Sequence, residues 1–271
     1  MKRKKLLILY IVLLFVAIAT IISVRKFHIT QILFNYDYPE IRDKGVLRIV
    51  TEYNQTGYYI SGDTIQGFQY ELSQAISDIS GLEVHITLST QLSESMELLV
   101  DRKYDIIAQN VSINTEYRED FLFSDPIVLN RQVLVQKANN SMFIHNQLDL
   151  AGKKIHVQQN SPAKLRLRNL EKEIGNPINI IEEKTYSDEQ LIVMVANGEI
   201  DYAVCDHSLA VAYQRIYPEI NIDTNISFTQ LQSWIVRKDA PILLDSLNVW
   251  LNKIKENGVY DEIYKRYYDH R

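Results

Sequence analysis

Apolar and polar positions follow two alternating periods along residues 45–271. A period of two, or a short apolar run, is typical of strands, and recurrence at three and four residues is typical of helices. Gly81 follows the first helical stretch, where a glycine readily ends a helix. The first strands are expected at 46–50, 83–88 and 105–108, and the helices between them at 68–79 and 92–100. This order predicts right-handed crossovers and a mostly parallel sheet.

The pattern repeats after a further strand predicted at 131–137. Ser161-Pro162 suits the start of one helix, and Ser187 with Gln190 has the spacing of a capping box. Further strands are expected at 155–157, 178–182 and 200–204, with later helices over 208–217 and from Pro241 to Gly258. The sequence therefore predicts two similar α/β halves with a strand crossing between them.

The N-terminus has a different pattern. Residues 2–5 are all basic, and residues 6–24 carry no charge. A helix of roughly 17–25 apolar residues can span a bilayer, and the basic cluster predicts a cytoplasmic N-terminus. A cleaved signal peptide, with Ala17-Ile18-Ala19 as its site, is the alternative. Because the apolar run continues to Val24, we expect an uncleaved anchor within 1–26 and an extracytoplasmic remainder.

Composition narrows the functional classes. The chain has 271 residues, a net charge of −5 and 46% apolar residues, which suffices for two small domains with real cores. There is no basic excess that would indicate nucleic-acid binding. Cys205 is the only cysteine and the six histidines are scattered, so we expect no disulfide, no metal site and no cofactor. Residues 27–44 are expected to be a tether, with Pro39 as a breaker.

Five segments occur in an order that resembles bacterial extracellular solute-binding proteins of family 3. They are Gly67–Leu72, the strand at 105–108, Phe123–Pro126, Leu150–Lys154 and Gly198–Tyr202. These proteins are the polar amino-acid-binding components of ABC transporters. Within the family, Tyr213–Glu219 resembles the N-terminal, non-catalytic domain of membrane-bound lytic murein transglycosylase F. The resemblance implies a two-lobed, type II periplasmic-binding-protein (Venus-flytrap) fold, with lobe 1 at 45–133 plus 232–271 and lobe 2 at 134–231.

The resemblance also implies a site for a zwitterion. An arginine after the third strand would hold the ligand carboxylate, and Arg118 takes that place if the register shifts by one residue; otherwise Tyr117 does. Asp206 would hold the ammonium group. Its local sequence suits the N-cap of the following helix equally well.

Other expected contacts come from both halves. Ser161 stands at a helix start whose backbone N–H groups would face the carboxylate, although Pro162 has no N–H to give. The remaining expected ligand contacts are the polar Ser112 and Asn110 and the aromatic Tyr53, Tyr58 and Phe68. Phe68 could equally be a core residue.

Three functions are compatible with these features. The first is a membrane-anchored binding domain that closes on an amino acid, a short peptide or a peptidoglycan fragment, with an ABC permease or a cell-wall hydrolase as partner. The second is cell-wall cleavage, but Glu94-Ser95 lies on a predicted helix and no lysozyme-like domain follows, so we expect no catalysis. The third is a structural or partner-binding envelope domain.

Overall fold

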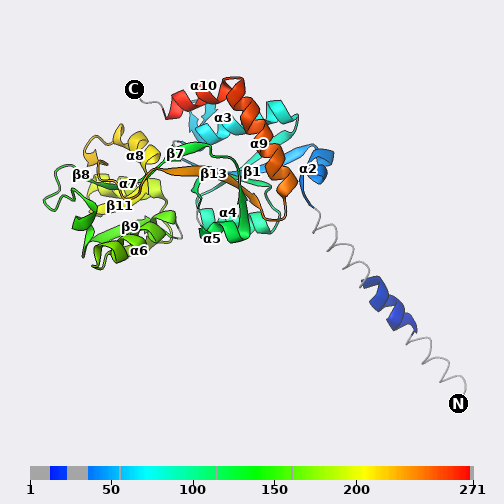
Figure 1. Ribbon diagram of the computed structural model, residues 1–271, viewed down its shortest axis with the longest axis horizontal. Coiled ribbons are helices and arrows are strands. Elements are labelled where there is room, and N and C mark those ends of the chain that lie inside the picture. Colours follow the sequence, from blue (N-terminus) through cyan, green and yellow to red (C-terminus); the bar gives the residue numbers. More distant parts are fainter. Residues whose placement is uncertain (1–12, 23–35, 55, 114, 160, 269–271) are drawn as a thin grey trace, which may run out of the picture.

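Two lobes make up the folded body, and strands β7 and β13 pass between them (Figure 1). The computed structural model describes residues 13–22, 36–54, 56–113, 115–159 and 161–268. Each lobe contains one main sheet with helices on its faces, so the expected two-lobed α/β architecture is confirmed.

The sheet of lobe 1 has the order β4-β1-β5-β13-β6, and β7 also pairs with β13. Its strands are β1 Val46–Glu52, β4 Glu83–Ser89, β5 Ile106–Ser112, β6 Phe121–Phe123, β7 Val128–Asn130 and β13 Gln230–Arg237. Strand β1 runs parallel to β4 and β5, as the crossover pattern predicts, and β13 returns antiparallel to β5. The carboxyl ends of β1 and β5 therefore lie at the same edge of the sheet.

Helices cover both faces of this sheet. They are α2 Tyr38–Lys44, α3 Phe68–Ser80, α4 Leu92–Val100, α5 Thr115–Asp120, α9 Pro241–Glu256 and α10 Val259–Tyr267, and β2 Tyr59–Ser61 pairs with β3 Thr64–Gln66 in a hairpin. The larger core gathers apolar residues of α3, α9 and β13 around the fully buried Phe68 and Trp234. A smaller core, around Leu99 and Ile107, fills the opposite face.

Lobe 2 has a five-stranded sheet in the order β10-β9-β11-β8-β12. Its strands are β8 Gln132–Lys137, β9 Lys154–Gln158, β10 Asn179–Glu183, β11 Tyr202–Asp206 and β12 Ile220–Asn221, and its helices are η1 Gln147–Leu150, α6 Pro162–Ile174, α7 Asp188–Asn197 and α8 His207–Gln214. Strands β9, β10 and β11 are parallel. Ser187 caps α7 through the predicted capping box with Gln190.

The division between the lobes differs from the expected one by a few residues. Positions 133/134 lie inside β8, which belongs wholly to the sheet of lobe 2, and positions 231/232 lie inside β13 of lobe 1. The chain therefore changes lobe between Asn130 and Gln132, and returns between Ser227 and Gln230. The sequence pattern identifies a strand but not the sheet to which the strand belongs. The expected lobe boundaries therefore differ from the observed ones by a few residues.

Residues 36–44 belong to lobe 1, where a tether was expected. Asp37 caps α2, and its carboxylate also accepts hydrogen bonds from the backbone N–H groups of Ile242 and Leu243 at the start of α9, at 2.9 and 2.8 Å. Ile41 is fully buried in the core. Pro39 lies in the first turn of this helix, where proline is tolerated, rather than acting as a breaker.

Of the expected anchor at 6–24, the structure describes residues 13–22. These residues are helical, and their large apolar side chains, such as Leu14 and Phe15, are exposed. Residues 6–12, 23 and 24 lie outside the described residues. Within the described ranges, no helix combines the length and apolar character needed to cross a bilayer.

Candidate functional site

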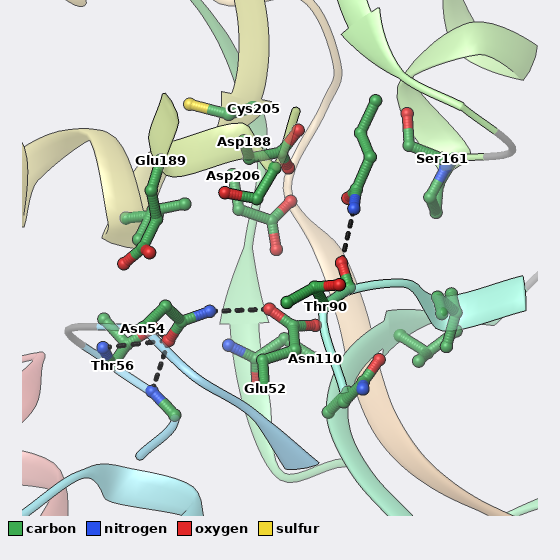
Figure 2. Close-up of a pocket in the computed structure, with 18 of the residues that line it drawn as sticks. Glu52, Asn54, Thr56, Thr90, Asn110, Ser161, Asp188, Glu189, Cys205 and Asp206 are labelled. Carbon is green, nitrogen blue, oxygen red and sulfur yellow. Dashed lines mark hydrogen bonds between the residues drawn. The ribbon is translucent and has the colours of Figure 1, made fainter. Parts of the chain in front are cut away.

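The candidate site is a cleft lined by residues of both lobes. Lobe 1 contributes the ends of β1 and β5 and the loops that follow β1 and β4. Lobe 2 contributes the end of β11 and the starts of α6, α7 and α8 (Figure 2). These are strand carboxyl ends and helix N-termini, the places where open α/β sheets bind ligands.

Asp206 occupies the N-cap position of α8, but its side chain makes no capping hydrogen bond. Asn130 accepts the N–H of Ser208 instead, at 3.4 Å. The carboxylate of Asp206 accepts hydrogen bonds from Asn130 Nδ2 at 3.3 Å and Gln232 Nε2 at 2.9 Å, and lines the cleft. Of the two interpretations of Asp206 from the sequence, this geometry favours a cleft residue over a helix cap.

Glu52, at the end of β1, approaches from lobe 1. Asn54 Nδ2 donates to its carboxylate at 2.6 Å, while Asn54 Oδ1 accepts the N–H groups of Thr56 and Gly57 at 3.1 and 2.5 Å (Figure 2). A single asparagine therefore holds the loop and orients the carboxylate.

Four carboxyl groups meet in the cleft: Glu52 from lobe 1, and Asp188, Glu189 and Asp206 from lobe 2 (Figure 2). Burial, together with the charges of Asp206 and Glu189, raises the pKa of Glu52 to about 7. Burial raises the pKa of Asp206 to about 6. Burial and the charges of Asp206, Glu52 and Glu189 raise the pKa of Asp188 well above its ordinary value. Burial and neighbouring like charges both disfavour the ionised form of a carboxyl group, which accounts for these raised pKa values.

Several buried polar atoms in the cleft lack a protein partner. Gln109 and Gln132 are 1% and 5% exposed, and the side-chain oxygen of each accepts no hydrogen bond. Oδ1 of Asp188 and Oγ of Ser161 are also buried without partners. All four residues line the cleft. Since buried polar atoms are usually satisfied, these atoms indicate where a ligand would bind.

Asn110 lies at the lobe 1 side of the cleft within a chain of side-chain hydrogen bonds. Trp234 Nε1 donates to Gln69 Oε1 at 2.6 Å, and Gln69 Nε2 donates to Asn110 Oδ1 at 2.7 Å. Asn110 Nδ2 then donates to the hydroxyl of Tyr268 at 2.8 Å. The network ties β13, α3, β5 and the residue after α10 together, and so fixes the orientation of Asn110.

Two hydrogen bonds join the lobes across the cleft opening. Gln158 Nε2 donates to the carbonyl oxygen of Thr90 at 2.6 Å (Figure 2), and Gln91 Nε2 donates to that of Lys184 at 2.8 Å. In each pair, a side chain of one lobe binds backbone of the other. We call these two bonds the latch.

The residues expected at the site divide into two groups. Those that line the cleft are Tyr53, Asn110, Ser112, Ser161 and Asp206. Arg118, Tyr58 and Phe68 are not among the lining residues, which corrects the predicted clamp and two of the predicted aromatic walls. Phe68 is fully buried in the core of lobe 1, the alternative noted from its sequence context, and Tyr58 packs edge-on against Tyr70.

The carboxylate clamp is absent where it was expected. Arg118 is exposed on the short helix α5, and its carbonyl oxygen accepts a hydrogen bond from Lys238. Tyr117, the alternative, packs against the smaller core of lobe 1. The reason is that β5 continues to Ser112 where a loop from Gln109 was expected, so the chain leaves the cleft before α5 begins. Among the described lining residues there is no lysine, arginine or histidine.

Sequence reasoning missed Glu52, Asp188, Glu189, Gln109 and Gln132. Glu52 follows an alternating strand and could have been found as the polar residue at a strand end. Asp188 and Glu189 lie in the acidic first turn of α7, between the two residues of its capping box, where acidic residues commonly stabilise a helix. Nothing in the local sequence distinguishes the two glutamines from surface residues. Among the described residues, no group of three or more His, Cys, Asp or Glu is arranged to hold a metal ion.

Two α/β lobes, two crossing strands and a polar cleft between them define the class of two-lobed binding proteins. Residues 47–270 match the family described as bacterial extracellular solute-binding proteins, family 3, and the chain belongs to this family.

Sequence relatives extend the similarity. Membrane-bound lytic murein transglycosylase F of Desulfosudis oleivorans is 32% identical over 276 residues, covering 98% of this chain and 57% of the relative. The protein of the same name from Aeromonas hydrophila is 32% identical over 199 residues, 73% of this chain and 40% of the relative. The chain thus spans about half the length of these curated relatives.

Solved structures share the fold. An ancestral arginine-binding protein bound to glutamine matches with a TM-score of 0.74 and 25% identity, over 83% of this chain and 98% of that one. A mutant of ArgBP from T. maritima matches with a TM-score of 0.75 and 23% identity, over 86% and 99%. The expected fold and family are therefore confirmed.

Proposed function

We propose that this chain is an extracytoplasmic solute-binding domain whose lobes close on a small polar ligand with an amino group. The carboxylate of Asp206, turned into a cleft between two lobes instead of capping its helix, is the observation that carries the proposal. An ammonium group would take the charge-assisted hydrogen bonds that this carboxylate can still accept. Amino acids, short peptides and peptidoglycan fragments are the candidate ligands.

Closure would be a hinge motion about β7 and β13. Because closure excludes water, each polar contact to the ligand would gain strength relative to an open surface. The latch supports this motion, since Thr90, Gln91, Gln158 and Lys184 already meet across the opening. An ABC permease would be the partner if the domain serves uptake, as for the solved relative described as the substrate-binding protein of an amino acid ABC transporter.

A melting-temperature screen tests the proposal. A ligand that binds only the native state must raise the melting temperature by mass action, by a few degrees near 100 times Kd. We expect at least one compound from a panel of amino acids, dipeptides and muropeptides to do so. Asp206→Asn should weaken the binding of that compound by about 2–5 kcal/mol. Arg118→Ala should leave its affinity unchanged. A loss at Arg118→Ala with none at Asp206→Asn would contradict the site.

A second candidate is a regulatory module of cell-wall turnover without catalysis of its own. The identity to transglycosylase F relatives, of which this chain covers about half, favours it. Glu94, which resembles a catalytic glutamate in sequence, is exposed on α4 and is not among the cleft residues. Zymography with the purified chain should show no clearing of peptidoglycan, and a clearing band lost in Glu94→Gln would refute this.

We further propose that residues 6–24 anchor the domain in the inner membrane, with the folded body on the extracytoplasmic side. The uncharged run after four basic residues supports the anchor, as do the exposed apolar side chains of residues 13–22. The protein should remain in the membrane fraction after an alkaline wash, with its N-terminus intact. A mature chain that begins near Thr20 and washes off would contradict the anchor.

A further inference from the structure

The charge balance of the cleft goes beyond what an amino-acid site needs. An amino acid brings one ammonium and one carboxylate, and each must be met by an opposite charge or by hydrogen bonds when it is buried. Here Glu52, Asp188, Glu189 and Asp206 all face the cleft, and its described lining residues include no basic side chain. A ligand carboxylate would lie among acidic side chains and would find no basic counter-ion among the described lining residues.

The unsatisfied atoms of the cleft point in the same direction. The oxygens of Gln109 and Gln132 can only accept hydrogen bonds, and so can ionised Oδ1 of Asp188. Both glutamines are at least nine-tenths buried. The unpaired glutamine oxygens are a separate observation from the acidic side chains, because amide oxygens carry no net charge and still accept hydrogen bonds. An ammonium or guanidinium group offers several N–H donors and no acceptor, which meets both demands.

We propose that the cleft selects small organic cations, amines or guanidines that carry more positive than negative charge and need no partner for a carboxylate. The inference rests on the proposed function, because it names the ligand class of the same cleft. One cationic end would bind between Asp206 and Asp188 in lobe 2, and Glu52 would contact it from lobe 1. The ligand would thus neutralise carboxylates of both lobes and favour closure.

Other ligands that could satisfy acceptors fit less well. A neutral sugar would donate hydroxyl groups but bring no positive charge to Glu52, Asp188 and Asp206. A divalent metal would supply the charge, but the described acidic side chains are not arranged as a metal site. The raised pKa of Glu52 and Asp206 adds a distinct signature, because a bound cation favours their ionised forms. Cation binding near pH 7 should therefore release protons.

Titration calorimetry with a charge series tests the proposal. The probes are agmatine and putrescine (two positive charges), arginine (net one), glutamine (none), glutamate (net negative), N-acetylglucosamine and calcium chloride. We expect agmatine or putrescine to bind at least ten-fold more tightly than glutamine, with arginine between them. The measured binding enthalpy should differ between phosphate and Tris at pH 7. The buffer takes up the released protons, and the enthalpy of protonation differs between these two buffers.

Charge-neutral variants sharpen the test. Glu52→Gln should weaken the dication by about ten-fold, and the control Asp245→Asn, which removes an exposed carboxylate of α9 outside the cleft, should not. Glutamine, N-acetylglucosamine or calcium binding more tightly than either dication would overturn the inference. Of these outcomes, only glutamine binding would leave the proposed function standing, because glutamine carries the amino group that the proposal requires. If no probe and no compound of the wider panel binds the folded chain, both are overturned.

Discussion

Glu52 shows how a single side chain in the cleft makes stability depend on pH. Its pKa is raised from 4.5 to about 7 by burial and by neighbouring carboxylates. Below pH 4.5 both the folded and the unfolded states hold the proton, so no penalty arises. As the pH rises to 7 the unfolded state releases the proton first, and the folded domain loses that share of its stability.

Glu52→Gln should therefore stabilise the ligand-free domain at pH 8, by on the order of 1–3 kcal/mol, and leave it unchanged at pH 4. Glutamine keeps an acceptor for Asn54 Nδ2, so the loop should persist. Urea unfolding at both pH values measures the difference. Asp245→Asn is the control, and an equal gain from Glu52→Gln at pH 4 and pH 8 would show that the effect is not ionisation.

Single residues were the hardest feature to predict from sequence. Asp206 was identified because a resemblance pointed to it, and the structure shows its carboxylate in the cleft. Arg118 was placed in the cleft by the same reasoning, and this was wrong because β5 ends at Ser112, four residues later than expected, which changes the residues that reach the edge of the sheet. Gln109 and Gln132 could not be distinguished, since their importance depends on partners that lie far away in sequence.

Helix α3 links the core to the cleft through Gln69, which is 3% exposed. This side chain accepts a hydrogen bond from the buried indole N–H of Trp234 and donates one to the side-chain oxygen Oδ1 of Asn110. Gln69→Met keeps the volume but removes both bonds, and should lower the free energy of unfolding by about 2–4 kcal/mol, because two partners lose their hydrogen bonds. Thermal or urea unfolding measures this. The same change at half-buried Gln74 on α3 is the control, and equal losses would contradict the network.

Helix α2 contributes to stability through Asp37. Its carboxylate accepts the N–H of Tyr38 in α2 and those of Ile242 and Leu243 in α9, so one residue caps two helices. Asp37→Ala should cost about 2 kcal/mol of stability, at the upper end for a helix cap. Asp43→Ala, at an exposed position of the same helix, should cost little. Equal stability of chains that begin at residue 36 and at residue 45 would contradict this role.

Most helices and strands follow directly from the pattern of apolar residues. Helix α3 and its end at Gly81, helix α4 and the capping box of α7 all lie where the sequence predicts them. Helix α2 was missed because it has only seven residues, and Pro39 in its first turn was taken as a breaker. The capping box of Asp37 and Glu40 at its start was not noticed. Helix α10 was missed although Ile263 is buried and Tyr264 and Tyr267 pack against Phe68 at helical spacing, because Gly258 was taken as the end of the last helix.

The latch joins the two lobes through two side chain–backbone hydrogen bonds. If the two glutamine bonds hold the lobes together, their loss should lower the closed population and reduce apparent affinity in proportion. Gln91→Ala with Gln158→Ala should cost about 1–3 kcal/mol of binding, from two hydrogen bonds. It should also raise the radius of gyration of the free domain in small-angle X-ray scattering. Calorimetry measures the first effect.

Gln147→Ala is the matched control for the latch. It removes a bond of the same kind, from Gln147 Nε2 to the carbonyl oxygen of Asn225 at 2.9 Å, but within lobe 2. Its radius of gyration and affinity should match those of the parent. A latch variant with unchanged radius and affinity would show that other contacts hold the lobes.

The two-lobed architecture was predictable because each half repeats a simple strand–helix order and the chain crosses between them. The relative position of the lobes was not predictable, since Gln91 and Gln158 each pair with a backbone carbonyl of the other lobe, 93 and 68 positions away in the sequence. Because every residue has a backbone carbonyl, the residue types do not show which carbonyl accepts a hydrogen bond from the other lobe.

Lobe 2 is an insertion into lobe 1, because the chain enters it after Asn130 and leaves it before Gln230. Both α2 and α10, the first and last elements of the folded body, therefore belong to lobe 1 (Figure 1). If the N-terminal segment is held at a membrane, lobe 1 is the stationary body and lobe 2 swings. A membrane partner that contacts lobe 2 would then experience the displacement that accompanies ligand binding, whereas one that contacts lobe 1 alone would not.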